Sequence, residues 1–298
     1  MTEPSKATAG TALIAGCGYL GRRVAESWQQ AGLVTSVVTR SAERAADFRE
    51  QNLKPVVCDL SDPQVRIRLP QADLVLWAVG FDRSAGVPRE QIWLDGLKRL
   101  IEGLSSAPQR FLYVSSTSVY GQTDGETINE HSATNPVTEG GQCCLQAEQL
   151  AREVLADRFP TTQLLVLRMA GIYGPDRLLR RTQDLLSKSP LAGEPDHDLN
   201  LIHVDDAVRM VRYAASAMNI PDVINVVNSG TVTRRIYYER LAELVSAPAP
   251  VFDGAGNSTL RPRSGNKRVT SRYHLSGAAD FLFDDVLTGL ADAVNRSG

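Results

Sequence analysis

Short apolar runs alternate with amphipathic, helix-like stretches along most of the chain. The apolar runs predict strands of a sheet that is buried on both faces, over residues 11–15, 34–39, 54–58, 73–79, 110–114, 163–168 and 223–227. Helical spacing appears between them in two apolar stripes, which are Trp93, Leu97, Leu100, Ile101 and Leu104, and Ala147, Ala151, Val154 and Leu155. This alternation predicts an α/β fold, a Rossmann-type doubly wound parallel sheet built from right-handed βαβ units.

The first apolar run ends at three glycines spaced G-x-G-x-x-G, which are Gly16, Gly18 and Gly21. Such a turn binds dinucleotides because Gly16 permits the tight turn, Gly18 lets a pyrophosphate approach the backbone, and Gly21 lets strand and helix pack closely. A helix predicted to end before Gly32 would direct its N-terminal N–H groups at the phosphates. An ordinary glycine-rich turn is the alternative, but the strand before and the helix after it favour cofactor binding. The expected contacts are Gly16, Cys17, Gly18, Tyr19, Leu20 and Gly21.

The second apolar run ends at Arg40, about 20 residues past the turn, where an acidic residue usually binds a free ribose 2′-hydroxyl. The planar guanidinium of Arg40 suits the 2′-phosphate of NADP, with Ser41 and Arg44 as helpers. Two alternatives stay open, a solvated arginine at a strand end and a ribose contact from Glu43. The sequence therefore favours NADP as cofactor, with NAD as the alternative.

Composition excludes several classes of partner. The net charge is −2 at pH 7, so nucleic acid is not an expected partner. No apolar run reaches the roughly 18 residues of a membrane span, and we expect a cytoplasmic protein without a membrane partner. The four cysteines, Cys17, Cys58, Cys143 and Cys144, lack C-x-x-C spacing and are expected to be reduced. No Cys/His constellation predicts a metal.

The chain changes character after Tyr173. Residues 174–200 and 228–298 are richer in Pro, Gly, Ser and Arg and alternate less regularly. We expect them to form a smaller C-terminal substrate lobe, and residues 1–173 and 201–227 to form the dinucleotide-binding domain. The lobe segments carry basic residues that would suit a small anionic or diphosphate-bearing ligand, or that simply form a solvated face: Arg177, Arg180, Arg181, Lys188, Arg261, Arg263, Lys267 and Arg268.

Several further motifs accompany the glycine turn. They are Cys58-Asp-Leu60, Ser115-Ser-Thr-Ser-Val-Tyr-Gly121, Leu167-Arg-Met-Ala-Gly-Ile-Tyr-Gly-Pro175, Ile202-His-Val-Asp-Asp206, Gly265-Asn-Lys-Arg-Val269 and Asp285-Val-Leu-Thr-Gly-Leu290. In this order and spacing they resemble the extended short-chain dehydrogenase/reductases, which include the nucleotide-sugar epimerases and dehydratases. The resemblance covers nearly the whole chain. The G-x-G-x-x-G spacing is more typical of an atypical, epimerase-like branch of that family.

The resemblance implies further site residues. Cofactor contacts are expected from Asp59, Leu60, Trp77, Ala78, Val79, Gly80 and Ser115. Ser116 is expected to orient a substrate, whereas His203 and Arg168 are expected to be structural. The residues alone leave two other roles open, because Asp59 can cap a helix and Ser116 can close a turn. Two helices, 88–104 and 145–158, pair subunits in many family members, so the resemblance is compatible with a homodimer.

The sequence departs from the family at the catalytic helix, where the family carries Tyr-x-x-x-Lys and a Glu four residues beyond the Lys. Aligning Glu148 with that Glu puts Gly140 at the tyrosine and Cys144 at the lysine, and residues 121–172 contain neither tyrosine nor lysine. The tyrosine moves a proton while hydride is transferred, and the lysine lowers a phenol pKa of about 10. Losing such a base costs about 10²–10⁴ in rate.

Three classes of function remain. The first is an NAD(P)-binding, epimerase/dehydratase-like oxidoreductase that acts on or senses a small ligand of nucleotide-sugar type, with Ser116, Tyr120 and Cys144 as catalytic candidates and Tyr173 as another replacement base. The second is a catalytically inactive NADP(H)-binding sensor or regulatory protein. The third is an interaction module with a vestigial cofactor site, which the intact glycine turn argues against.

Overall fold

The computed structural model describes residues 10–82, 86–178, 182–191, 193–253, 265–273, 280–283 and 285–297. These residues form two compact units. One lies within Met1–Val114, Gln146–Val166 and Ala214–Asp222, and the other within Ser115–Leu145, Leu167–Tyr213 and Val223–Gly298. The domain division expected from composition, with a lobe of 174–200 and 228–298, stays a prediction.

Seven strands form the central sheet, in the order β11-β7-β5-β4-β1-β2-β3. Their bounds are β1 (Thr11–Ala15), β2 (Val34–Thr39), β3 (Lys54–Val57), β4 (Leu74–Trp77), β5 (Arg110–Ser116), β7 (Gln163–Met169) and β11 (Val223–Val226). β1 pairs in parallel with β2 on one side and with β4 on the other. The chain therefore reverses its winding direction between β3 and β4, which places the switch point of the fold beside β1. The predicted Rossmann-type α/β fold is confirmed.

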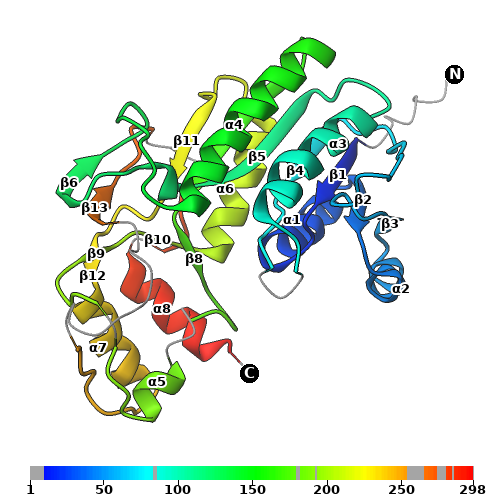
Figure 1. Cartoon of the computed structure of the whole chain (residues 1–298). Helices are drawn as coiled ribbons and strands as arrows, with labels where there is room; N and C mark the ends of the chain where they lie inside the picture. The colour runs from blue at the N-terminus through cyan, green and yellow to red at the C-terminus, as the bar shows by residue number, and fades with distance from the viewer. Residues whose placement is uncertain are drawn as a thin grey trace, which may run out of the picture. The chain divides into compact units, whose positions relative to one another are not determined.

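Helices connect the strands. They are α1 (Tyr19–Gln30), α2 (Ala42–Glu50), a π-helical turn η2 (Gln91–Asp95), α3 (Gly96–Gly103), α4 (Glu139–Arg158), α5 (Thr182–Leu186), α6 (Val204–Ser216), α7 (Arg234–Leu244) and α8 (Val286–Asn295). Figure 1 shows α1 and α2, in blue, beside β1, β2 and β3. The apolar stripe of α1 explains this packing, because Val24 and Trp28 are buried while Glu26 on the opposite face is exposed. No helix of the described residues is long and apolar enough to cross a membrane.

The second unit has a core of its own. Tyr173, Tyr237, Leu241 and Leu290 are fully buried in one apolar cluster to which α7 and α8 contribute. Short strands complete this unit as pairs, β6 (Asp124–Ile128) with β13 (Asn266–Val269), β8 (Gly171–Tyr173) with β10 (Leu201–His203), and β9 (Asp198–Leu199) with β12 (Val232–Thr233).

Candidate functional site

The three glycines at the end of β1 meet three different surroundings. Gly16 has a φ of +91°, and a Cβ there would lie 2.3 Å from the backbone of Ala78. A Cβ at Gly21 would lie 2.2 Å from the Gly16 carbonyl oxygen, whereas a Cβ at Gly18 would have nothing within 4 Å. The first and third glycines are therefore required by close backbone packing, and the second borders open space. The tight turn at Gly16 and the close packing at Gly21 agree with the spacing, and a pyrophosphate contact at Gly18 stays a prediction.

A cavity of about 450 Å³ opens beside this turn. Most of the residues predicted to contact the cofactor line it, namely Gly16, Cys17, Gly18, Arg40, Ser41, Asp59, Leu60, Trp77, Ala78, Val79 and Gly80. The other predicted contacts are Tyr19, Leu20 and Gly21 in the first turn of α1, and Ser115, buried in β5. The ends of β1, β2, β3 and β4 thus supply one continuous surface, at the carboxyl edge where open α/β sheets bind ligands.

One end of the cavity is rich in arginine. Arg40 Nη2 lies 3.2 Å from Asp82 Oδ2, and both side chains are about half exposed, at 53% and 52%. Arg44 Nη2 donates to the Cys17 carbonyl oxygen at 2.7 Å, and its guanidinium lies 5.4 Å from the centre of the Phe48 ring. Sequence reasoning did not identify Asp82 or Phe48 as members of this site.

Two predicted residues hold local structure in the cavity wall. The Ser41 hydroxyl accepts the Arg44 N–H at 3.1 Å and so caps α2. Asp59 Oδ1 accepts both the N–H and the hydroxyl of Ser61, at 2.9 and 2.6 Å. Both residues still face the cavity, so a structural contact and a ligand contact are compatible for each.

The cysteines in this cavity are not activated thiols. Cys17 and Cys58 are free and buried, as expected for reduced thiols in a protein interior. Burial raises the pKa of the Cys17 thiol to about 11, although Arg22 and Arg44 oppose the rise. A thiol with so high a pKa is a weak nucleophile at neutral pH.

The catalytic candidates lie in the second unit, and two of them are held by hydrogen bonds. Ser116 Oγ accepts the N–H of Ser118 at 3.1 Å, which closes the turn after β5. The buried Tyr120 hydroxyl donates to Asn225 Oδ1 at 2.8 Å and accepts from Arg168 Nη1 at 2.9 Å. Burial raises the pKa of Tyr120, and the Arg168 guanidinium opposes that rise only in part. Tyr120 is thus a phenol that is difficult to deprotonate.

Tyr173 is in a similar state. Its hydroxyl donates to the Val286 carbonyl oxygen at 3.1 Å in the interior of the second unit, and burial raises its pKa. Its surroundings are tight, because a Cβ at Gly289 would lie 2.3 Å from the hydroxyl oxygen. Neither tyrosine therefore resembles a base prepared for proton transfer.

Gly140 and Cys144 lie one turn apart on α4, the spacing that Tyr-x-x-x-Lys requires. Cys144 is buried, at 6% exposure, and so is Glu148 one turn further on. A Cβ at Gly141 would lie 2.3 Å from the Ser118 carbonyl oxygen, so α4 begins directly against the turn that follows β5. The assignment of Ser116, Tyr120 and Cys144 to catalysis stays a prediction.

Comparison with known proteins identifies the family. A sequence model of the NAD dependent epimerase/dehydratase family matches residues 12–227. The chain belongs to this family. The match agrees with the resemblance to extended short-chain dehydrogenases found in the sequence motifs.

Three proteins similar to this chain share 16% to 28% sequence identity with it. Protein YeeZ of Escherichia coli strain K12 is 27% identical over 248 residues, which cover 80% of this chain and 85% of YeeZ. A dTDP-6-deoxy-L-talose 4-dehydrogenase (NAD(P)(+)) of Kitasatospora kifunensis is 28% identical over 292 residues, which cover 87% of this chain and 88% of that protein. The crystal structure of UDP-glucuronic acid 4-epimerase from Bacillus cereus in complex with NAD has a TM-score of 0.73 at 16% identity, over 96% of this chain and 98% of that chain.

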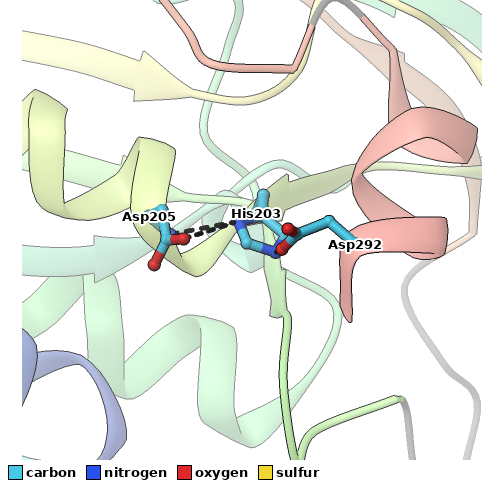
Figure 2. A group of neighbouring side chains, drawn as sticks. All are labelled: His203, Asp205 and Asp292. Atoms are coloured by element: carbon cyan, nitrogen blue, oxygen red, sulfur yellow. Dashed lines mark hydrogen bonds and ion pairs between the residues drawn. The ribbon is translucent and has the colours of Figure 1, made fainter. Parts of the chain in front are cut away.

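This chain also contains a cluster of ionisable side chains around His203 that was not predicted (Figure 2). His203 is fully buried, and its ring lies between two carboxylates, with Nδ1 3.8 Å from Asp205 Oδ2 and Nε2 3.5 Å from Asp292 Oδ2. Its Nδ1 also accepts the Asp205 N–H at 3.2 Å. Arg296 Nη1 reaches both carboxylates, at 2.6 and 2.9 Å. A guanidinium already supplies a positive charge here, so the two carboxylates form an ion-pair network with Arg296 that joins α6 to α8.

The basic residues of the predicted lobe are in different states. Arg177 and Lys188 are exposed, and Arg268 pairs with Asp198 at 3.6 Å. Lys267 is buried at 3% exposure, donates to the Gln122 carbonyl oxygen at 3.2 Å, and has a pKa lowered by burial. The others, Arg180, Arg181, Arg261 and Arg263, lie outside the described residues.

Proposed function

We propose that this chain is an NAD(P)-binding, epimerase/dehydratase-like oxidoreductase that holds its cofactor in the cavity beside β1, with NADP(H) preferred over NAD(H). The observation that carries the proposal is the meeting of the glycine turn, Arg40 and Trp77–Gly80 in one cavity. A bound nicotinamide would supply a hydride donor or acceptor. The NAD in the Bacillus cereus structure and the NAD(P)(+) in the name of the Kitasatospora relative support the cofactor class.

The residues of the cavity fit a dinucleotide in shape and charge. Open space over Gly18 leaves room for a pyrophosphate, and the N-terminus of α1 directs N–H groups to the same place. Arg40 would bind the 2′-phosphate, and Asp59 with Leu60 would contact the adenine. The Arg40 guanidinium is the reason for preferring NADP, because it can bind a phosphate through two parallel hydrogen bonds.

The substrate is proposed to be a small anionic molecule of nucleotide-sugar type. The printed names of the relatives support this class, since both the Kitasatospora dehydrogenase and the Bacillus epimerase are named for nucleotide sugars. Ser116 would orient a substrate hydroxyl. A homodimer and a cytoplasmic location remain part of the proposal, on the family resemblance and the composition.

A second candidate function is a catalytically inactive NADP(H)-binding protein that responds to its cofactor. It is favoured by the hydrogen bonds that engage the hydroxyls of both Tyr120 and Tyr173, together with Gly140 and Cys144 at the family's catalytic positions. Such a protein would bind the same cofactor in the same cavity. The two candidate functions therefore share a binding site and differ in whether the protein turns over a substrate.

Equilibrium titration with NADPH and NADH tests the cofactor proposal. Wild type should bind NADPH more tightly, and Arg40→Ala should weaken NADPH binding by about tenfold or more, since a hydrogen bond between charged groups is lost, while NADH binding changes little. Arg49→Ala is the matched control, because Arg49 is also exposed on this part of the chain but does not line the cavity. Equal affinities for both cofactors, or no effect of Arg40→Ala, would rule out the NADP preference.

A further inference from the structure

The ion pair between Arg40 and Asp82 crosses the end of β1. Arg40 follows β2 directly and Asp82 lies in the segment after β4, while β1 lies between these two strands in the sheet. β2 and β4 are therefore about 10 Å apart, and the pair joins their ends on the side where Gly16 and Gly18 form the turn. Both members line the cavity proposed to hold the cofactor.

The neighbouring guanidinium is already engaged by the protein. Arg44 donates to the Cys17 carbonyl oxygen at 2.7 Å, which is an uncharged backbone group. Arg40 instead pairs with a half-exposed carboxylate, that of Asp82, at 3.2 Å. A half-exposed ion pair is weak and exchangeable, so a phosphate can displace it.

We propose that Asp82 determines cofactor specificity by competing with the 2′-phosphate of NADP for Arg40. The proposal rests on the proposed cofactor site. When NAD is bound, the Arg40–Asp82 pair can persist, because a free 2′-hydroxyl carries no charge. When NADP is bound, its 2′-phosphate must displace Asp82 from the Arg40 guanidinium. The phosphate then also lies near the Asp82 carboxylate, and the two negative charges repel each other. Asp82 thus narrows the NADP preference that Arg40 creates.

The test compares the ratio of NADPH to NADH affinity in wild type and in Asp82→Asn, at low ionic strength. Asp82→Asn should tighten NADPH binding by about two- to tenfold, the range set by an exposed ion pair plus a like-charge contact, and should change NADH binding by less than twofold. Asp47→Asn is the matched control, since Asp47 is an exposed carboxylate on α2 that does not line the cavity. Thermal unfolding checks that each variant folds.

Repeating Asp82→Asn in the Arg40→Ala background isolates the competition. The gain in NADPH affinity should be smaller there, because the contested guanidinium is absent. Three results would each overturn the proposal while leaving the cofactor site intact. They are a ratio of NADPH to NADH affinity that Asp82→Asn does not change, an equal gain in NADPH affinity in both backgrounds, and an equal gain from Asp47→Asn. Failure of wild type to bind either dinucleotide would overturn both the site and this inference.

Discussion

Gly18 and Gly21 lie three residues apart, yet a side chain would meet open space at one and a backbone carbonyl at the other. Gly18→Val should therefore abolish dinucleotide binding with the fold intact, because the side chain fills the space that the pyrophosphate needs. Gly21→Ala should instead lower the free energy of unfolding by about 1–3 kcal/mol, through overpacking against Gly16. Thermal unfolding with and without NADPH separates the two effects. Cofactor-dependent stabilisation that persists in Gly18→Val would mean that the phosphates bind elsewhere.

Single residues differ in how far the sequence could predict them. The glycines and Arg40 were predictable because a local pattern fixes their place at the ends of β1 and β2. Asp82 was not predictable, because its place in the site depends on a side-chain pair with Arg40, which is 42 residues away along the chain. Similarly, the partner of the Tyr120 hydroxyl is Asn225, which is 105 residues away along the chain. No local pattern predicts such a contact.

Helix α6 contains a buried acid that makes stability depend on pH. Asp206 is fully buried in its first turn and accepts the Leu282 N–H, and desolvation raises its pKa to about 6 from 3.8. The pKa of Asp206 is higher in the folded than in the unfolded state. The contribution of Asp206 to the free energy of unfolding is therefore fully present below about pH 4 and is lost as the pH rises through about 6.

Asp206→Asn should remove this dependence, because asparagine keeps an oxygen for the Leu282 N–H and has no charge to bury. Relative to wild type, the variant should gain about 3 kcal/mol of unfolding free energy between pH 4 and pH 7. Denaturant unfolding at several pH values measures the difference, with Asp222→Asn as an exposed control. A constant difference between wild type and Asp206→Asn across this range would show that Asp206 does not titrate as proposed.

At the scale of elements, the length of the apolar run decided which strands the sequence could predict. The strands of the central sheet are short apolar runs, and their positions agree with the predicted ones to within a few residues. β6 and β13 were missed because their sequences, Asp-Gly-Glu-Thr-Ile and Asn-Lys-Arg-Val, show no apolar alternation. These two strands form by pairing with each other, as in Lys267 opposite Glu126, although they are far apart along the chain. Such pairing depends on the tertiary structure and leaves no local pattern in the sequence.

For the whole molecule, the sheet could be inferred from the alternation of apolar and helical stretches and the family from the order of the motifs, whereas the chemistry could not be inferred. The sequence motif predicts Gly140 and Cys144 at the family positions for tyrosine and lysine. The two phenols considered as replacement bases, Tyr120 and Tyr173, are buried and hydrogen-bonded. We therefore propose a dinucleotide site in a chain whose positions for the usual proton-transfer pair are occupied by Gly140 and Cys144.

The most direct test of this account is the rate at which wild type, saturated with NADP(H), turns over nucleotide sugars. We predict cofactor binding with slow turnover, about 10²–10⁴ below that of a family member that carries the tyrosine and lysine, because the general base is lost. The variants Cys144→Ala, Tyr120→Phe and Tyr173→Phe show whether any activity depends on a replacement group. Robust turnover that survives all three substitutions would contradict the account, since proton transfer would then come from a residue that it assigns to no catalytic role.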